Sequence, residues 1–574
     1  MFEKVSSLID KANSVVWGAP TVLLLVGTGI FFTVILKFFQ FSKMRLWLDN
    51  TLFAIFKKGE VRNSKDSQNI SQFQAVSTAL AATIGTGNIA GVATAVSAGG
   101  PGAVFWMWVS ALFGMMTSYS ENVLGIYFRK KNADGQWCGG PMYYIRDGLK
   151  EKKHLSKISK PLSFFYAFLL IGASLGIGNM TQANSISDSL SSSFGFSVFI
   201  VGAVLAVITL LVISGGVKRI GNVTEKLVPF MALFYIITTL YIFISNYNSI
   251  PYVFSSIFKN AFSLKAVFGA AGGIAIQKCI SMGFRRGIFS NEAGLGASVT
   301  VNSCSSVKEP AKQGMWGIFQ VFVDTIIVCT MTAFVLLSTS VDAVPIETAL
   351  QNITEETQYV YIGESMPEDG KVMLTDTDAN RVLKISTDGS EYTASANGKK
   401  YTISISQSDE YSYTNVMALK GIKDANGNIT NISLEPVDGV SLVTLAFSKR
   451  LGNISAVILS VAIVLFAFST VIGWSFYGTK ACEYLFGKKS LKAYKIIYVV
   501  FVFIGAITKL SVVWGISDTL NGLMAIPNLI ALLALSGTVV KITDNFLKRK
   551  NGEKLNPMLS SDEEIQFELE NGES

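Results

Sequence analysis

The chain of 574 residues has few of the residue types that perform catalysis, bind transition metals or form disulfides. It contains one histidine, His154, which lies in a basic segment and which we expect to be a solvated loop residue. The five cysteines form no Cys-x-x-Cys pair, which argues against a disulfide framework or a zinc site. The sequence also has no glycine-rich phosphate loop and no paired nucleophile and base, so we expect no enzyme activity and no cofactor.

Charge is scarce as well. Charged residues make up 15% of the chain and hydrophobic residues 50%, whereas about a quarter of a typical soluble domain is charged. The net charge of +8 does not indicate nucleic-acid binding, because the Lys and Arg residues cluster in short loops between apolar runs. This pattern is typical of a helical protein that crosses the lipid bilayer many times.

Eleven apolar runs predict eleven membrane-spanning helices. A basic segment follows every odd-numbered run, which places the N-terminus outside and the C-terminus in the cytoplasm of a cell-membrane protein. The first run is too long for the core of a cleavable signal and lacks a cleavage motif, so we expect it to be retained. The predicted spans are residues 18–39, 72–97, 103–127, 162–180, 195–214, 227–245, 267–285, 314–339, 452–477, 493–511 and 516–540.

One segment does not fit the membrane. Residues 341–440 contain 16 acidic and 7 basic side chains, a net charge of −9. Alternating runs at 381–385 and 401–405, with turn pairs such as Asn397-Gly398, predict a β-rich insert on the outer face. The alternative is a disordered hydrophilic loop. We therefore expect a membrane domain in two parts, 1–340 and 441–550, around this insert, and a disordered cytoplasmic tail at 551–574.

The second predicted span is interrupted at its centre by Gly85, Thr86, Gly87 and Asn88. Glycine weakens a helix, and hydrocarbon cannot satisfy the backbone groups that a break exposes. We therefore expect a broken helix that lines a polar cavity, as in many secondary transporters. The freed amides from Gly85 onward could hold a carboxylate, and freed carbonyls near Ala81 and Ile84 could hold a cation. The alternative is that the glycines only permit close helix packing.

A second glycine-rich stretch lies in the seventh predicted span, at Gly269, Gly272, Gly273 and Ile274. Two interrupted helices five spans apart fit an inverted five-plus-five repeat, which is the best sequence indication of a transporter site.

Further polar or aromatic side chains in the predicted spans are candidates for the same site. Ser469 and Thr470 could bind a hard cation or simply bond to their own helix. Trp474 could form the wall of a pocket or anchor the helix at the interface. Asp324, an acid within the eighth span, could pair with a cation, carry a proton or have a structural role. Gln182 could reach a substrate or lie in a loop.

These segments together resemble the alanine/glycine:cation symporter family of bacteria and archaea. The matching segments follow one another in order from about residue 70 to 515, and the Phe-Trp-Met-Trp and Phe-Ser-Asn-Glu-Ala-Gly strings are highly specific. They are residues 85–91, 99–108, 139–145, 286–296, 324–330 and 468–474.

The resemblance implies an all-α, LeuT-like membrane fold with one additional N-terminal helix. It also implies uptake of alanine, in the L or D form, or of glycine, driven by Na⁺ or by H⁺. Two groups of site residues follow from it. The first faces the amino acid and comprises Thr83, Gly85, Thr86, Gly87, Asn88, Gln182, Gly269, Gly272, Gly273, Ile274 and Trp474. The second is the sodium site, formed by Ala81, Ile84, Ser469 and Thr470.

Two departures from the family pattern stand out. The insert at 341–440 is longer than the usual connection, and a role in sensing, gating or docking is open. The stretch from Gly296 to Val299 also differs, and we expect it at the cytoplasmic face, away from the substrate. An ion channel, or a receptor that uses the insert, is the competing function. No feature of the sequence indicates an oligomeric state.

Overall fold

The computed structural model describes residues 12–13, 16–57, 61–62, 69–262, 270–339, 439–508 and 511–571, and the strands between residues 344 and 436. Helices dominate it, and each of the eleven predicted spans overlaps a helix or a helix pair. The main helices are α2 (Ala19–Ile35), α6 (Gln72–Thr83), α7 (Ala90–Gly99), α8 (Gly102–Tyr127), α10 (Ser156–Leu175), α11 (Thr181–Phe194), α12 (Val198–Ser214), α13 (Gly216–Ser245), α14 (Ile250–Ala261), α15 (Ala270–Asn291), α16 (Val299–Asn302), α17 (Pro310–Val321), α18 (Thr330–Ser338), α20 (Gly439–Leu451), α21 (Ile454–Phe486), α22 (Leu491–Ile507), α23 (Ser511–Ala534) and α24 (Ser536–Lys550).

Within the described residues, five helices are long and apolar enough to cross a membrane, or seven if each bent pair counts as one span. Fewer described helices meet this criterion than the eleven spans predicted from the sequence. One reason is length, since α2 and α12 have 17 residues each and a perpendicular span needs about 20.

Two of the long helices contain π-helical segments. Gly176–Met180 (η3) joins α10 to α11, and Phe322–Cys329 (η6) joins α17 to α18. A π-helical segment adds a residue to the turn and displaces the side chains around it, and such bulges often occur at functional sites. Two of the polar residues predicted from the sequence lie at these segments, because η3 ends two residues before Gln182 and η6 contains Asp324.

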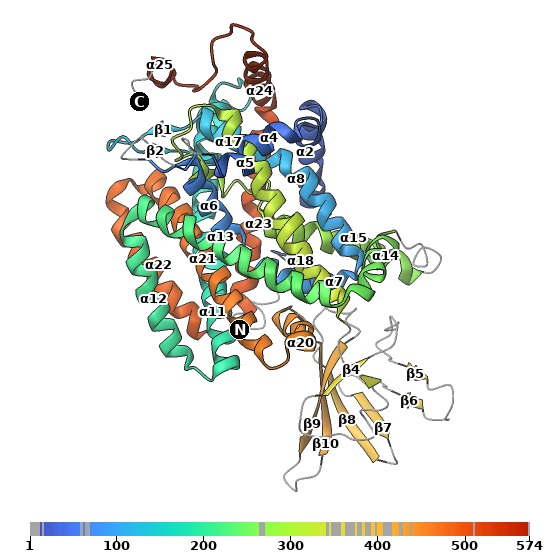
Figure 1. Cartoon of the computed structure of the whole chain (residues 1–574). Coiled ribbons are helices and arrows are strands. Elements are labelled where there is room, and N and C mark those ends of the chain that lie inside the picture. The colour runs from blue at the N-terminus through green and yellow to red at the C-terminus, as the bar shows by residue number, and fades with distance from the viewer. Residues whose placement is uncertain are drawn as a thin grey trace.

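The helices pack into one bundle (Figure 1). Large hydrophobic side chains on its outside remain exposed, for example Phe168 of α10, Ile200 of α12 and Phe230 of α13. Exposed apolar surface of this extent is characteristic of a face that contacts lipid. The interior instead holds the polar side chains around α6, α15 and α21.

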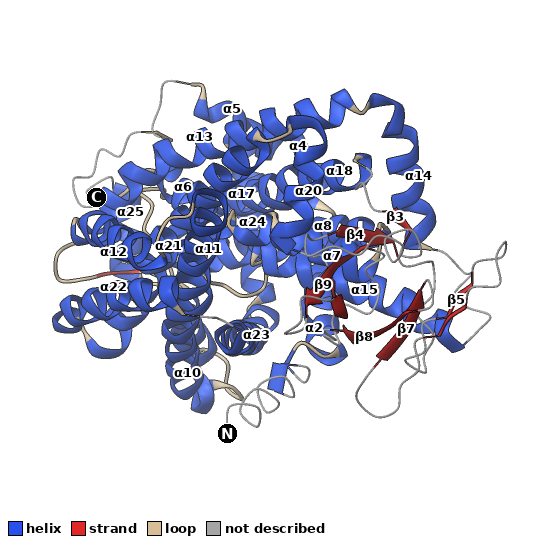
Figure 2. Cartoon of the chain, turned by 90° about the horizontal axis from the view of Figure 1, so that it is seen from below, coloured by secondary structure: helices blue, strands red, loops and turns tan. Residues whose placement is uncertain are grey.

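The segment between α18 and α20 contains eight described strands. Six form one sheet in the order β3-β4-β9-β10-β8-β7, and β5 pairs with β6. The strands are β3 (Val344–Pro345), β4 (Gln358–Tyr361), β5 (Met373–Thr375), β6 (Val382–Lys384), β7 (Tyr392–Ala396), β8 (Lys399–Ile405), β9 (Val416–Lys423) and β10 (Ile429–Pro436). The sheet projects from the end of the bundle opposite α24 and covers only one side of that end (Figures 1 and 2).

In the insert, β6 and β8 coincide with the two alternating runs that predict strands. The predicted turn pairs at 388–389, 397–398 and 426–427 lie outside the described residues. The strands on either side of the second pair, β7 and β8, are antiparallel neighbours, and Ala396 lies opposite Lys399.

The prediction of a disordered tail is wrong for residues 551–571. This segment lies at the end of the bundle where α24, β1 and β2 are found, and it contains α25 (Glu563–Asn571) (Figure 1). Ile565 and Leu569 are buried in a cluster with Leu559 and Trp137, the latter from the hairpin of β1 (Lys130–Lys131) and β2 (Trp137–Cys138). The composition of the tail is acidic, but two apolar residues four positions apart give α25 a face that the hairpin covers.

Salt bridges hold the same contact. Lys130 Nζ lies 2.5 Å from Asp562 Oδ2, and Lys131 Nζ lies 2.5 Å from Glu568 Oε2. The Lys130 ammonium lowers the pKa of Asp562 below its ordinary value. Two of the acidic residues that suggest disorder therefore have basic partners on the hairpin. These pairs could not be predicted from the sequence, because the partners are far apart in the chain.

Candidate functional site

The helix break predicted in the second span is present. α6 ends at Thr83, a short 3-10 helix (η1) covers Thr86–Asn88, and α7 begins at Ala90 at an angle of 61° to α6. The capping box between Ser71 and Gln74 sets the start of α6. At the break, the Gly85 amide donates to Asn88 Oδ1 over 2.9 Å. The Asn88 side chain thus replaces a helical acceptor, and a polar break becomes possible in an apolar interior.

The four predicted sodium ligands converge beside this break. Ser469 Oγ lies 3.1 Å from the Ala81 carbonyl oxygen, and Thr470 Oγ1 lies 3.2 Å from the same atom. The Ile84 carbonyl oxygen is 3.5 and 3.4 Å from the two hydroxyl oxygens. All of these residues are buried. For oxygens about 2.4 Å from a hard cation, octahedral edges measure about 3.4 Å, so the four atoms have the spacing of a coordination shell.

Both hydroxyls also donate to the Phe466 carbonyl of their own helix, at 2.8 Å for Ser469 and 3.1 Å for Thr470. The structural alternative from the sequence therefore occurs as well. The two roles are compatible, because a hydroxyl that donates one bond keeps lone pairs for a cation.

Gln182 is an interior residue and not part of a loop. The helix that begins at Ser156 continues through η3 to Phe194, well beyond the predicted end at residue 180. Gln182 Oε1 accepts a hydrogen bond from Thr86 Oγ1 at 3.2 Å and lies 3.5 Å from the Thr86 amide nitrogen. The sequence underestimates this helix because its second half is rich in serine.

Trp474 is buried as well, at 1% exposure, so it is not an interfacial anchor. A Cβ atom at Gly178 would lie 2.2 Å from Cγ of the Trp474 indole, so the absence of a side chain at Gly178 makes room for the ring. Gly178 belongs to η3. The indole therefore packs against the helix segment that precedes Gln182, one turn before the residue that contacts Thr86.

The second glycine-rich stretch is helical where the structure describes it. Gly269 is outside the described residues, while Gly272, Gly273 and Ile274 belong to α15, which runs without interruption from Ala270 to Asn291. The chain leaves the helix only after Asn291 and becomes helical again in α16. Three residues of this turn have positive φ angles, Glu292 (58°), Gly294 (94°) and Gly296 (76°).

This turn is deep in the protein. Ala293, Leu295 and Ala297 are buried, and the prediction that residues 296–299 lie at the cytoplasmic face stays a prediction. The two glycines with positive φ permit the turn, whereas Gly272 and Gly273 are tolerated inside a helix. A glycine count does not distinguish these two uses, because only the backbone angles reveal where the helix stops.

Asp324 joins the first break to the end of α15. Its carboxylate accepts hydrogen bonds from Asn88 Nδ2 at 2.8 Å, Ser290 Oγ at 2.6 Å and Thr325 Oγ1 at 2.9 Å. It is fully buried within the π-helical η6. Asn88 also donates to Ser290 Oγ at 2.9 Å, so these polar groups form one network.

Two buried acids are not among the site residues predicted from the sequence. Glu121 lies in α8 and accepts hydrogen bonds from Asn528 Nδ2 at 2.6 Å and the Gly294 amide at 3.1 Å. Glu292 is the first residue after α15. Glu121 falls inside the third predicted span, so the criterion that identified Asp324, an acid in an apolar run, would also have found it. Glu292 lies beyond the predicted end of its span and gave no such signal.

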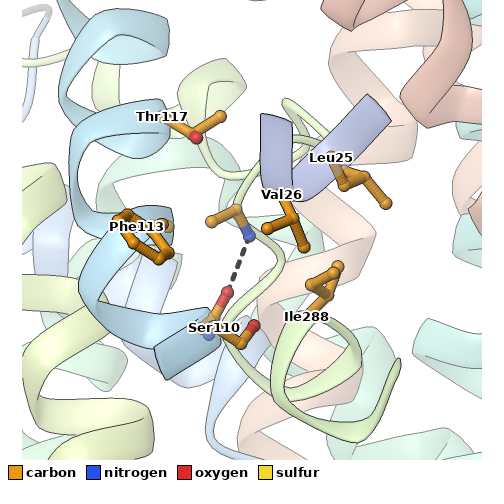
Figure 3. Close-up of a pocket in the computed structure, with 9 residues that line it drawn as sticks. Leu25, Val26, Ser110, Phe113, Thr117 and Ile288 are labelled. Atoms are coloured by element: carbon orange, nitrogen blue, oxygen red, sulfur yellow. Dashed lines mark hydrogen bonds between the residues drawn. The ribbon is translucent and has the colours of Figure 1, made fainter. Parts of the chain in front are cut away.

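A cavity borders the turn that follows α15, between α2, α8 and α15 (Figure 3). Leu25, Val26, Phe113 and Ile288 give it a largely apolar lining. None of the site residues predicted from the sequence is among its described lining residues, so it is distinct from the polar region around Asn88.

Comparison with known proteins gives a consistent result. Residues 2–370 and 416–560 match the model of a family described as the sodium:alanine symporter family. The unmatched residues, 371–415, fall within the β-rich insert. The chain is 39% identical to the sodium/alanine symporter AgcS of Methanococcus maripaludis, over 96% of this chain and 99% of that protein.

A second relative differs in its named substrate. The chain is 29% identical to the probable sodium/glutamine symporter GlnT of Bacillus subtilis, over 96% of this chain and 93% of that protein. Among solved structures, MhsT in complex with L-phenylalanine matches 84% of this chain and 99% of that one, at 12% identity and a TM-score of 0.44.

Proposed function

Because the chain belongs to the sodium:alanine symporter family, and is therefore a multi-pass transporter and not an enzyme, we propose that it takes up alanine, and glycine with it, together with Na⁺. The observation that carries this proposal is the convergence of the Ala81 and Ile84 carbonyls on the Ser469 and Thr470 hydroxyls. It gives a hard cation an oxygen-lined position directly beside the broken helix.

The amino acid is proposed to bind on the other side of the same break. The first amides of η1 can hold the substrate carboxylate, because a helix N-terminus attracts anions. The Gly85 amide is already bonded to Asn88, and the Thr86 amide lies 3.5 Å from Gln182 Oε1, so the substrate carboxylate takes the Gly87 amide and shares that of Thr86 with Gln182. The Trp474 indole and Phe289, whose ring lies 3.5 Å from a Cβ atom placed on Gly87, restrict the space to a small side chain.

Transport then follows alternating access in a LeuT-like arrangement, with the N-terminus outside and the C-terminus in the cytoplasm. Na⁺ and substrate share the backbone of residues 81–88, so binding of either one orders the break for the other. By linkage, Na⁺ raises the affinity for alanine by the same factor by which alanine raises the affinity for Na⁺.

Proton coupling is the second candidate. Asp324 is the observation in its favour, since a fully buried carboxylate bonded to the break residue Asn88 could couple protonation to the geometry of the break.

Uptake of labelled alanine and glycine into proteoliposomes, with Na⁺ and H⁺ gradients imposed separately, tests both candidates. Accumulation driven by Na⁺ at equal pH supports the proposal. Accumulation that requires the H⁺ gradient and ignores Na⁺ supports the second candidate instead. Uptake that persists after removal of residues 371–415 argues against a receptor function of the insert.

A further inference from the structure

Glu292 is the least satisfied of the buried acids beside the break. Its side chain is 5% exposed, and its Oε2 atom has no hydrogen-bond partner among the described residues. The residue adopts a left-handed backbone conformation, with φ of 58°, which non-glycine residues rarely take. Its carboxylate is thus held inside the protein with one oxygen free.

The other two acids have more hydrogen bonds. Both oxygens of Asp324 are bonded, to Asn88, Ser290 and Thr325. Glu121 also has an unbonded Oε2 atom, but its Oε1 atom accepts hydrogen bonds from Asn528 and the Gly294 amide. The groups that act on Glu292 are the Asp324 and Glu121 carboxylates, which repel it, and the Trp474 indole; Tyr166 and Tyr477 are also close enough to feel its charge. No cationic side chain of the described region is among them.

The buried cations of the described region are committed elsewhere. Arg129 donates to the carbonyls of Ser303, Ser305 and Val307, and Lys480 pairs with Glu483. A buried carboxylate that stays charged needs a cationic partner, because its desolvation is costly. Glu292 has an oxygen available for such a partner, and a ligand can supply it.

The position of Glu292 indicates which ligand. Phe289, three residues before it, approaches Gly87, and Ser290 is bonded to Asn88. Glu292 therefore directly follows the end of α15 that contacts η1, and the Trp474 indole is among the groups that act on its carboxylate. An α-amino acid carries its ammonium and carboxylate groups on one carbon, so a site that holds the carboxylate at η1 needs an anion a short distance away.

The surroundings favour an ammonium group over a metal ion. A hard cation takes about six to eight oxygen ligands. Four oxygens converge at Ala81, Ile84, Ser469 and Thr470, whereas no group of three or more His, Cys, Asp or Glu side chains in the described part of the chain could hold a metal ion. One carboxylate oxygen beside an indole suits an organic ammonium, which hydrogen-bonds to the oxygen and is attracted by the aromatic face.

We propose that the Glu292 carboxylate binds the ammonium group of the transported amino acid. This inference rests on the proposed function and adds the residue that makes the site specific for amines. It replaces the carbonyls of the predicted second break, at residues 269–274, as the partner of the ammonium.

The test measures alanine against lactate, which carries a hydroxyl in place of the ammonium. Labelled alanine is bound to the purified full-length protein in Na⁺, and unlabelled alanine and lactate compete for it. Glu292→Gln should weaken alanine binding about ten- to a hundredfold, the value of a charge-assisted hydrogen bond. Lactate affinity should stay constant or rise, because the carboxylate that repels the lactate anion is gone.

Two further variants separate charge from structure. Glu292→Asp keeps the charge and should retain most of the preference for alanine over lactate. Glu121→Gln removes a neighbouring acid that is held by Asn528 and the Gly294 amide, and it should leave that preference unchanged even if it lowers the melting temperature.

Three results would overturn the inference. The first is a Glu292→Gln variant with the wild-type ratio of alanine to lactate affinity. The second is an equal loss of that ratio in Glu292→Gln and Glu292→Asp. The third is wild-type alanine affinity in Glu292→Gln together with lost H⁺ dependence of uptake, which would make Glu292 a proton site. Wild-type protein that binds neither alanine nor glycine refutes the proposed function, and this inference with it.

Discussion

Gly85 offers the sharpest test of the proposed link between the helix break and the cation. Its backbone is extended, with φ of −133° and ψ of −156°, so alanine can adopt it without strain. The added Cβ atom, however, would lie 2.6 Å from Thr470 Oγ1, where ordinary contacts begin at 3.4 Å. Gly85→Ala therefore forces the Thr470 hydroxyl away by about 0.8 Å, which breaks the oxygen shell while leaving the carbonyls in place.

The expected magnitude follows from overpacking. A displacement of this kind costs about 1–3 kcal/mol, which corresponds to about a 5- to 150-fold loss of Na⁺ affinity. The assay is the Na⁺ concentration that gives half-maximal binding of labelled alanine to purified protein. Melting temperatures measured in parallel show how much of the cost falls on the folded state.

Two variants serve as controls. Gly91→Ala lies in α7, where an added Cβ meets no atom within 4 Å, and it should leave Na⁺ dependence unchanged. Gly85→Ala combined with Thr470→Ala removes the clash and should recover stability but not Na⁺ affinity, because one ligand is lost. Wild-type Na⁺ dependence in Gly85→Ala would refute the assignment of Thr470 to the cation site.

Three further predictions concern the site and the tail. Ser469→Ala should raise the Na⁺ concentration for half-maximal uptake at least about fivefold, because a ligand and its hydrogen bond are lost; a change in alanine affinity at saturating Na⁺ would contradict it. Gln182→Glu should abolish alanine binding, since a carboxylate would face the substrate carboxylate near Thr86, and Gln182→Asn, with a shorter amide, should retain part of the binding measured in the same assay. Leu569→Ala should make the tail more sensitive to protease, because the lost burial of the side chain removes about 1.5–3 kcal/mol of stabilisation. The effect should exceed that of Lys130→Ala, since the partly exposed ion pair between Lys130 and Asp562 contributes about 0–1 kcal/mol. This ion pair stabilises the tail above the pKa of Asp562, which Lys130 lowers, and is lost in acid below it.

The first break shows what a sequence can reveal about a site. Gly85 and Gly87 interrupt an apolar run, and the physics of the bilayer requires that backbone groups freed there find partners. The run itself therefore predicts a polar interior at this position, and Asn88 supplies the partner through its bond to the Gly85 amide. The hydroxyls of Ser469 and Thr470 could be predicted for a similar reason, as adjacent oxygens in an apolar helix.

The second glycine-rich stretch shows the limit of predicting a helix break from the sequence. Gly272 and Gly273 stand in a continuous helix, while the chain turns at Glu292 and Gly294, residues that lie just past the predicted end of the span. The sequence shows where a glycine permits a positive φ angle. Whether the backbone adopts that angle is determined by contacts with distant residues. Tyr166 and Asn528 hold this turn through the carbonyls of Leu295 and Gly294, from helices far away in the chain.

The sequence by itself determined that the protein is helical, crosses a membrane, carries an interrupted helix at residue 85 and has a separate acidic segment. These features depend on composition and on local periodicity, which the chain contains in full. Only the tertiary structure decided that Asp324 bonds to Asn88, that Gln182 lies in the interior, that Glu292 has an unbonded oxygen beside Trp474, and that the acidic tail lies on Lys130 and Lys131. Each of these is a contact between residues distant in the chain, and such contacts are fixed by packing, not by neighbouring residues.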